Sequence, residues 1–93
     1  MGYIREWDHK KADSNTRKHG VTFDRASTVF GDPRALLLQD PDHSVVEERY
    51  LVLGMSNHDR SLVVAFAERP PRTRLISARL ATRQERRRYE EEG

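Results

Sequence analysis

Apolar residues of the chain are concentrated in its second half, in runs of strand length. Three stretches are rich in leucine, β-branched and aromatic residues, and the turn-like segments NHD and RPPR separate them. The sequence therefore predicts strands within residues 47–55, 61–69 and 73–81. A shorter leucine-rich run, Ala35–Gln39, predicts a strand before them, and Tyr3–Trp7 is a short β-prone stretch at the start.

The polar segment after Trp7 has the end signals of a helix but almost no apolar face. Asp8 is placed to cap its start, because a short acidic side chain can accept hydrogen bonds from the first free backbone N–H groups. Gly20 is suited to the left-handed conformation that ends many helices. Ala12 is nearly the only apolar residue between these ends, so we expect a helix that contacts the core weakly.

Two further helices are predicted from their capping residues. Thr22 can cap a helix in which Phe23, Ala26 and Phe30 recur at helical spacing, until Gly31-Asp32-Pro33 ends it. Near the C-terminus, Thr82 and Glu85 have the T-x-x-E spacing of a capping box, in which each residue bonds the backbone of the other. A C-terminal helix is therefore predicted to begin after Thr82.

The predicted elements follow the order β-α-α-β-β-β-β-α. Consecutive strands after two helices indicate an α+β fold, an antiparallel β-meander with the helices packed on one face. Side-chain alternation in the last strand separates two sets of residues. It places Arg74, Ile76, Ala78 and Leu80 toward the core, and Leu75, Ser77 and Arg79 on the opposite face, which an antiparallel sheet can expose to solvent.

The length and composition of the chain exclude several classes of protein. The 93 residues are enough for a single domain, residues 1–93, with one modest core. Because the chain has no cysteine, disulfides and thiolate metal sites are excluded. The N-terminus lacks an apolar signal core, and the longest apolar run, Leu62–Ala67, is too short to cross a bilayer. We therefore expect a cytoplasmic protein without membrane contact.

Charge is distributed unevenly, although the net charge is only +2. Residues 69–88 contain eight arginines and one acid, Glu85, whereas residues 24–48 contain six acids and two arginines. Such asymmetry is typical of a protein with a polyanionic partner on one side and a basic partner on the other. A solvated arginine-rich face is an equally simple interpretation of the charge run alone.

His19 is the first candidate for chemistry. Ala12, Asn15 and His19 share one helix stripe, which is too polar for core and suits either a hydrogen-bonded sheet edge or a polar cleft. The simpler interpretation is that Lys18 and His19 only help to end the helix, where positive charge favours the helix dipole. The four histidines lack a local ligand pair, so no metal site or cofactor is expected.

Short motifs are distributed along almost the whole chain. They are WDxxK at Trp7, Asp8 and Lys11, NxxKHGVxF from Asn15 to Phe23, Ala26, FGDP from Phe30 to Pro33, ExRY from Glu47 to Tyr50, Gly54, RLISAR from Arg74 to Arg79, and ERRxYE from Glu85 to Glu90. KHGV and ISAR together within so short a chain are a specific combination. In these motifs the chain resembles the BrnT family of bacterial toxin ribonucleases.

The resemblance implies a fold similar to RelE-type toxins and the toxin half of a type II toxin–antitoxin pair. It implies an endoribonuclease that needs no metal. It further implies inhibition by a BrnA-like ribbon-helix-helix antitoxin, in a two-to-two complex that binds operator DNA through the antitoxin. RNA cleavage without metal uses the 2′-hydroxyl as nucleophile, which DNA lacks.

Residues of suitable chemistry stand at the matching positions. Histidine and glutamate suit proton transfer, and the arginine fork suits phosphate. The resemblance thus predicts His19, Glu48, Arg49 and Arg79 as catalytic, with Lys18, Arg74, Arg83 and Arg87 as RNA-binding residues. Without the resemblance, Arg49 and Arg79 are ordinary strand residues and Glu48 is an ordinary surface ion-pair partner. The alternative function is a non-catalytic basic module that binds nucleic acid or protein.

Overall fold

The computed structural model describes residues 4–39 and 49–93 of the chain. None of the helices in these two ranges is long and apolar enough to span a membrane. The elements, in chain order, are β1 (Ile4–Glu6), α1 (His9–His19), α2 (Phe23–Ser27), the 3-10 helix η1 (Thr28–Gly31), β2 (Leu36–Gln39), β3 (Arg49–Met55), β4 (Ser61–Arg69), β5 (Arg72–Leu80) and α3 (Arg83–Glu92).

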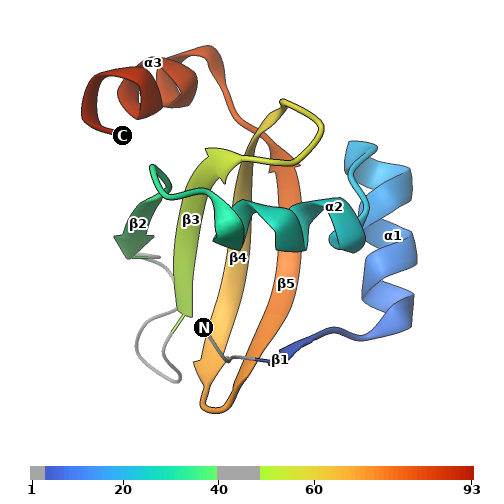
Figure 1. Cartoon of the computed structure of the whole chain (residues 1–93). Coiled ribbons are helices and arrows are strands. Elements are labelled where there is room, and N and C mark those ends of the chain that lie inside the picture. Colours follow the sequence, from blue (N-terminus) through green and yellow to red (C-terminus); the bar gives the residue numbers. More distant parts are fainter. Residues whose placement is uncertain (1–3, 40–48) are drawn as a thin grey trace.

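The strands form one mixed sheet in the order β1-β5-β4-β3-β2 (Figure 1). Strands β2 to β5 pair antiparallel with their neighbours in sequence, whereas β1 pairs parallel with β5, from Ile4 opposite Arg72 to Glu6 opposite Arg74. The prediction of a purely antiparallel sheet is therefore wrong at β1. A strand of three residues has too short a pattern to indicate its partner or direction.

Each face of the sheet has its own apolar cluster. On one face, residues of α2 and η1 such as Phe23 and Val29 pack against Val64 and Phe66 of β4, with Ala12 of α1 at the margin. On the other face, Leu53 and Val63 form a smaller cluster with Ala81, and Tyr89 of α3 packs against it. Helices therefore lie on both faces, and the prediction that they share one face is wrong.

A β-bulge in β5 changes the expected alternation of its side chains. Ala65 and Phe66 are consecutive in β4 but pair with Ser77 and Leu75, so Ile76 is an extra residue. Leu75 and Ala78 consequently both face the first cluster, with exposures of 1% and 0%, whereas Leu80 is 46% exposed. Leu75 and Arg74 thus lie on the faces opposite to those predicted, and Leu80 is exposed where core was predicted. Arg79 does lie on the face opposite Ala78, as predicted.

The predicted helix caps are confirmed. Asp8 accepts a hydrogen bond from the Lys10 backbone N–H, and Gly20 has the left-handed φ of 70° that ends α1. Thr22 caps α2, and Thr82 with Glu85 forms the expected capping box of α3. Phe30 belongs to η1, because the chain tightens into a 3-10 turn before Asp32.

Asp32, the residue after η1, forms hydrogen bonds with both β3 and α3. One of its carboxylate oxygens accepts hydrogen bonds from the Met55 backbone N–H at 2.8 Å and from the Tyr89 hydroxyl at 2.6 Å. The chain approaches so closely there that a Cβ atom on Gly54 would lie 2.8 Å from Val29 Cγ1. The FGDP and Gly54 motifs thus have a structural role, since they fix η1 and α3 against β3.

Candidate functional site

Asn15 fixes α1 to the edge of β5, beyond the end of β1. Its side-chain amide donates to the Ala78 carbonyl at 2.8 Å and to the Val21 carbonyl at 2.9 Å, while its oxygen accepts from the Ala78 N–H at 3.0 Å. The Asn15 side chain is thus bonded as a neighbouring strand would be. This contact holds the last turn of α1, and with it His19, beside the end of β5.

Replacing Asn15 by alanine should destabilise the protein by about 3 kcal/mol, because buried backbone groups of Ala78 and Val21 lose their partners. Urea unfolding of Asn15→Ala measures this loss. The control is Ser14→Ala, an exposed neighbour on the same helix. A destabilisation no larger than that of the control would show that the Asn15 contacts do not fix α1.

A polar cleft lies between α1 and β5. We call it the α1–β5 cleft; it is lined by Lys11, Ser14, Asn15, Lys18, His19, Ile76 and Ser77. His19 is half-buried in the last turn of α1, and Lys18 beside it is exposed. The stripe that includes Asn15 and His19 therefore both bonds the sheet edge and lines a cleft. His19 and Lys18 end the helix and also face a recess that could accept a phosphate-bearing chain.

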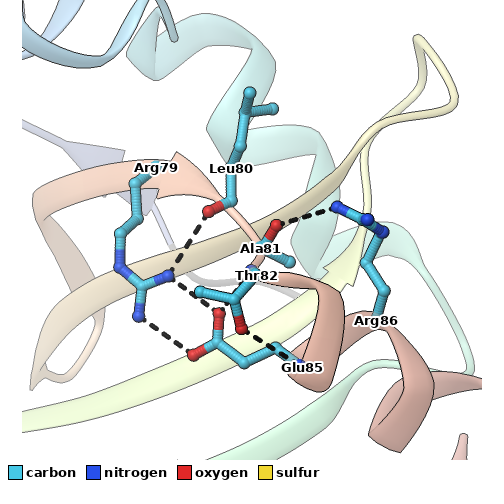
Figure 2. Close-up of polar contacts among 6 residues, drawn as sticks. All are labelled: Arg79, Leu80, Ala81, Thr82, Glu85 and Arg86. Carbon is cyan, nitrogen blue, oxygen red and sulfur yellow. Dashed lines mark hydrogen bonds and ion pairs between the residues drawn. The ribbon is translucent and has the colours of Figure 1, made fainter.

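Arg79 lies on the same sheet face as Ser77, two residues further along β5, and is held by a bidentate ion pair (Figure 2). Its Nη1 donates to Glu85 Oε1 at 2.8 Å and its Nη2 to Glu85 Oε2 at 3.0 Å; Nη1 also donates to the Leu80 carbonyl at 3.3 Å. The hydrogen bonds from Arg79 lower the pKa of Glu85 to about 2, and the same bonds raise the pKa of Arg79. Both groups are charged at neutral pH.

The Glu85 carboxylate should stabilise the fold only at a pH at which it is ionised in the folded protein. Because its folded pKa of about 2 lies below the ordinary glutamate pKa of 4.5, its contribution is complete above pH 4.5 and is lost as pH falls toward 2. The ion pair is partly exposed, so we expect about 1–2 kcal/mol. Chemical unfolding of the parent and Glu85→Gln across pH 2–7 measures it. A stability difference that does not shrink in acid would contradict the assignment.

Arg49 and Arg74 lie at the other end of the sheet. Both pair with Ala67, one from each side, so they are level and about 10 Å apart across the strands. Arg79 and Leu53 both pair with Val63 of β4, and Leu53 is four residues after Arg49 in β3. Along the strand direction, Arg79 is therefore about 13 Å from Arg49. Side chains stand roughly perpendicular to a sheet, so Arg49 and Arg79 do not converge on one phosphate. Arg74 is the arginine closer to Arg49.

The remaining candidates are placed on α3 or not described. Arg83 begins α3 and Arg87 is one turn further on; both are exposed. Glu48 lies outside the described residues. Within residues 4–39 and 49–93, no three histidine, aspartate or glutamate side chains form a group that could hold a metal ion.

Sequence reasoning missed three polar residues of this region. It treated Glu85 only as a helix cap, although Glu85 is also the partner of Arg79. Lys11 and Ser77 line the α1–β5 cleft but were not chosen as site residues. The seven-residue spacing of Lys11 and Lys18, two turns on one helix face, was the available signal for Lys11.

The fold and cleft define a small α+β domain with histidine, lysine and arginine side chains at one end of its sheet. Over residues 7–85 the sequence matches the family described as "Ribonuclease toxin, BrnT, of type II toxin-antitoxin system". The chain belongs to this BrnT family and is the toxin of a type II toxin–antitoxin system. The family resemblance inferred from the KHGV and ISAR motifs is thereby confirmed.

The fold is also similar to that of a solved structure. The crystal structure of the Brucella abortus ribonuclease toxin, BrnT, superposes with a TM-score of 0.67 at 21% sequence identity. The alignment covers 86% of this chain and 99% of that chain. No curated protein matches the sequence significantly. The structural likeness establishes the α+β fold, whereas the likeness to RelE-type toxins stays a prediction.

Proposed function

We propose that the protein is an endoribonuclease that cleaves RNA without a metal ion. The observation that carries the proposal is the α1–β5 cleft, where His19 and Lys18 lie beside Ser77, with Arg79 on the same sheet face two residues further on. The cleft thus provides a proton-transfer group, and phosphate-binding cations lie in it and beside it. Family membership supports RNA as the target.

The reaction consists of one displacement at phosphorus. The 2′-hydroxyl loses its proton to a base, the 2′ oxygen bonds to phosphorus, the bond from phosphorus to the 5′ oxygen breaks, and that oxygen gains a proton. The products are a 2′,3′-cyclic phosphate and a 5′-hydroxyl. His19 performs one of the two proton transfers, and Glu48 is the candidate for the other. Arg79 stabilises the charge that develops on the phosphate oxygens.

Positive side chains extend the site along the RNA. Lys18 lies in the cleft, and Arg83 and Arg87 are exposed on α3, which follows Arg79 in the chain. At the far end of the sheet, Arg49 and Arg74 flank Ala67 on the face that also bears Arg79. In this arrangement Arg79 contacts the reacting phosphate, while Arg49 and Arg74 act on a more distant part of the RNA.

The antitoxin belongs to the same proposal. A type II toxin has an antitoxin partner, and we propose a BrnA-like ribbon-helix-helix dimer that binds two toxins and represses their operon in the cytoplasm. The arginine-rich segment of residues 69–88 is where acidic or apolar residues of the antitoxin would compete with RNA.

Purified protein should cleave an RNA oligonucleotide in the presence of EDTA and leave DNA of the same sequence intact. RNA affinity should fall roughly tenfold or more between about 50 and 200 mM salt, because binding releases counterions. Gel analysis of cleavage and fluorescence anisotropy across a salt series measure both effects. Tight RNA binding without cleavage would instead support the non-catalytic module. Cleavage that stops when EDTA is added would contradict the metal-independent step.

A further inference from the structure

We propose that Glu85 is a positioning residue that orients Arg79 toward the RNA phosphate. The inference rests on the proposed function, because it assigns Glu85 a role in the same RNA cleavage. Glu85 is in the first turn of α3, six residues after Arg79, and the two side chains meet where the chain turns from β5 into α3 (Figure 2). The ion pair therefore joins the last strand to the last helix.

The hydrogen bonds of Arg79 leave one edge of its guanidinium for a ligand. The group has five N–H donors in one plane. Both hydrogens of Nη1 are used, for Glu85 and Leu80, and one hydrogen of Nη2 is used for Glu85. The Nε hydrogen and the second Nη2 hydrogen donate to none of the described residues. They point the same way, so they form the fork that binds two phosphate oxygens.

Glu85 is itself held in place by the helix start. Its Oε1 accepts from the Thr82 backbone N–H at 2.8 Å, and its own N–H donates to Thr82 Oγ at 3.1 Å. The nearby Arg86 side chain donates to the Ala81 carbonyl at 3.1 Å, which further fixes this turn. The carboxylate is thus oriented before RNA binds. A long and flexible arginine side chain gains a defined direction from it, which lowers the ordering cost of binding the phosphate.

Because Glu85 is negatively charged, its replacement by glutamine should affect RNA binding and the rate of cleavage differently. Near a phosphate, the carboxylate repels the RNA, so Glu85→Gln should bind RNA as well as the parent or better. The Arg79 fork would then be misdirected when charge develops on the phosphate. We therefore expect KM to stay unchanged or fall, while kcat falls about 10- to 100-fold. Glutamine can still form a capping box, so α3 should remain folded.

The matched control is Thr22→Ala, which removes the side-chain cap of another helix, α2, and contacts neither Glu85 nor Arg79. Melting temperature, kcat and KM are measured together for both variants. Thr22→Ala should keep the parent kcat even if it melts lower. Equal losses of kcat in the two variants would show that Glu85 acts only through the stability of the fold, which overturns the proposal.

A double-mutant cycle tests whether Glu85 acts through Arg79. In the Arg79→Ala background, Glu85→Gln should change kcat less than about twofold, because the group it orients is gone. The same loss in both backgrounds would overturn the positioning role. A fully active Glu85→Gln beside an inactive Arg79→Ala would reject this inference alone. A parent protein that cleaves no RNA would reject the proposed function and the role of Glu85 with it.

Discussion

Replacing His19 by glutamine should lower the rate of RNA cleavage by a factor of about 10²–10⁴ while leaving the protein folded. Glutamine is similar in size and can form hydrogen bonds, but it cannot exchange a proton with the RNA hydroxyl. His19 is half-buried at the end of α1, and Gly20 rather than His19 provides the left-handed residue that ends the helix. The fold therefore has little need of the imidazole, whereas the proposed reaction depends on it.

Cleavage rate and melting temperature of His19→Gln should be measured beside those of His58→Gln. His58 is exposed in the turn between β3 and β4 and is not among the residues that line the α1–β5 cleft. We expect parent activity for His58→Gln. If His19→Gln also cleaves RNA at the parent rate, His19 is only a helix-end residue and the catalytic assignment is wrong.

Replacing Arg79 by lysine should lower the cleavage rate by a factor of about 10²–10³, the range measured for removal of one preorganised charge-stabilising donor. Lysine keeps the positive charge but loses the planar fork, so it cannot bind Glu85 and two phosphate oxygens at once. Its ammonium can still pair with the Glu85 carboxylate, and Arg79 lies on the face opposite Ala78. We therefore expect a small change in stability.

The matched control is Arg72→Lys, in the same strand. Arg72 also forms an ion pair with a glutamate, Glu6, but at the far end of β5 and with 60% of its side chain exposed. Arg72→Lys should be nearly silent. Unchanged cleavage in Arg79→Lys would remove Arg79 from the active site. Arg49→Lys, measured in the same way, tests whether Arg49, which lies beside Arg74 at the other end of the sheet, contributes to cleavage or only to RNA affinity.

Local signals in the sequence predicted much of the secondary structure. Asp8, Gly20, Thr22 and Thr82 were recognised as cap residues because capping depends on one side chain and the few backbone groups next to it. The strands from residue 49 onward were predicted for a related reason, since long apolar runs bounded by turn residues need no knowledge of partners.

Features that depend on distant contacts were not predicted. The parallel partner of β1 is β5, the last strand of the described chain, and a strand of three residues carries too short a pattern to indicate so distant a partner. The extra residue Ile76 reverses the alternation within β5, so that Leu75 joins Ala78 in the core. Leu75 and Ile76 are adjacent apolar residues, and alternation alone does not tell which of the two faces the core.

The candidate site was predicted in parts but not as an arrangement. The family motifs indicated His19 and Arg79 separately, and the structure relates them through Asn15, which precedes His19 by one turn and bonds Ala78, the neighbour of Arg79. The ion pair from Arg79 to Glu85 could not be read from spacing, because its six-residue separation spans the end of a strand and the start of a helix.

The chemical nature of the new RNA ends tests the proposed mechanism most directly. RNA cleaved by the purified toxin in EDTA should carry 2′,3′-cyclic phosphates and 5′-hydroxyls, and a single 2′-deoxy substitution at the cleaved position should abolish cleavage there. Mass spectrometry of a short oligonucleotide resolves both results. Fragments with 5′-phosphates and 3′-hydroxyls, or cleavage that persists beside the deoxy sugar, would contradict attack by the 2′-hydroxyl.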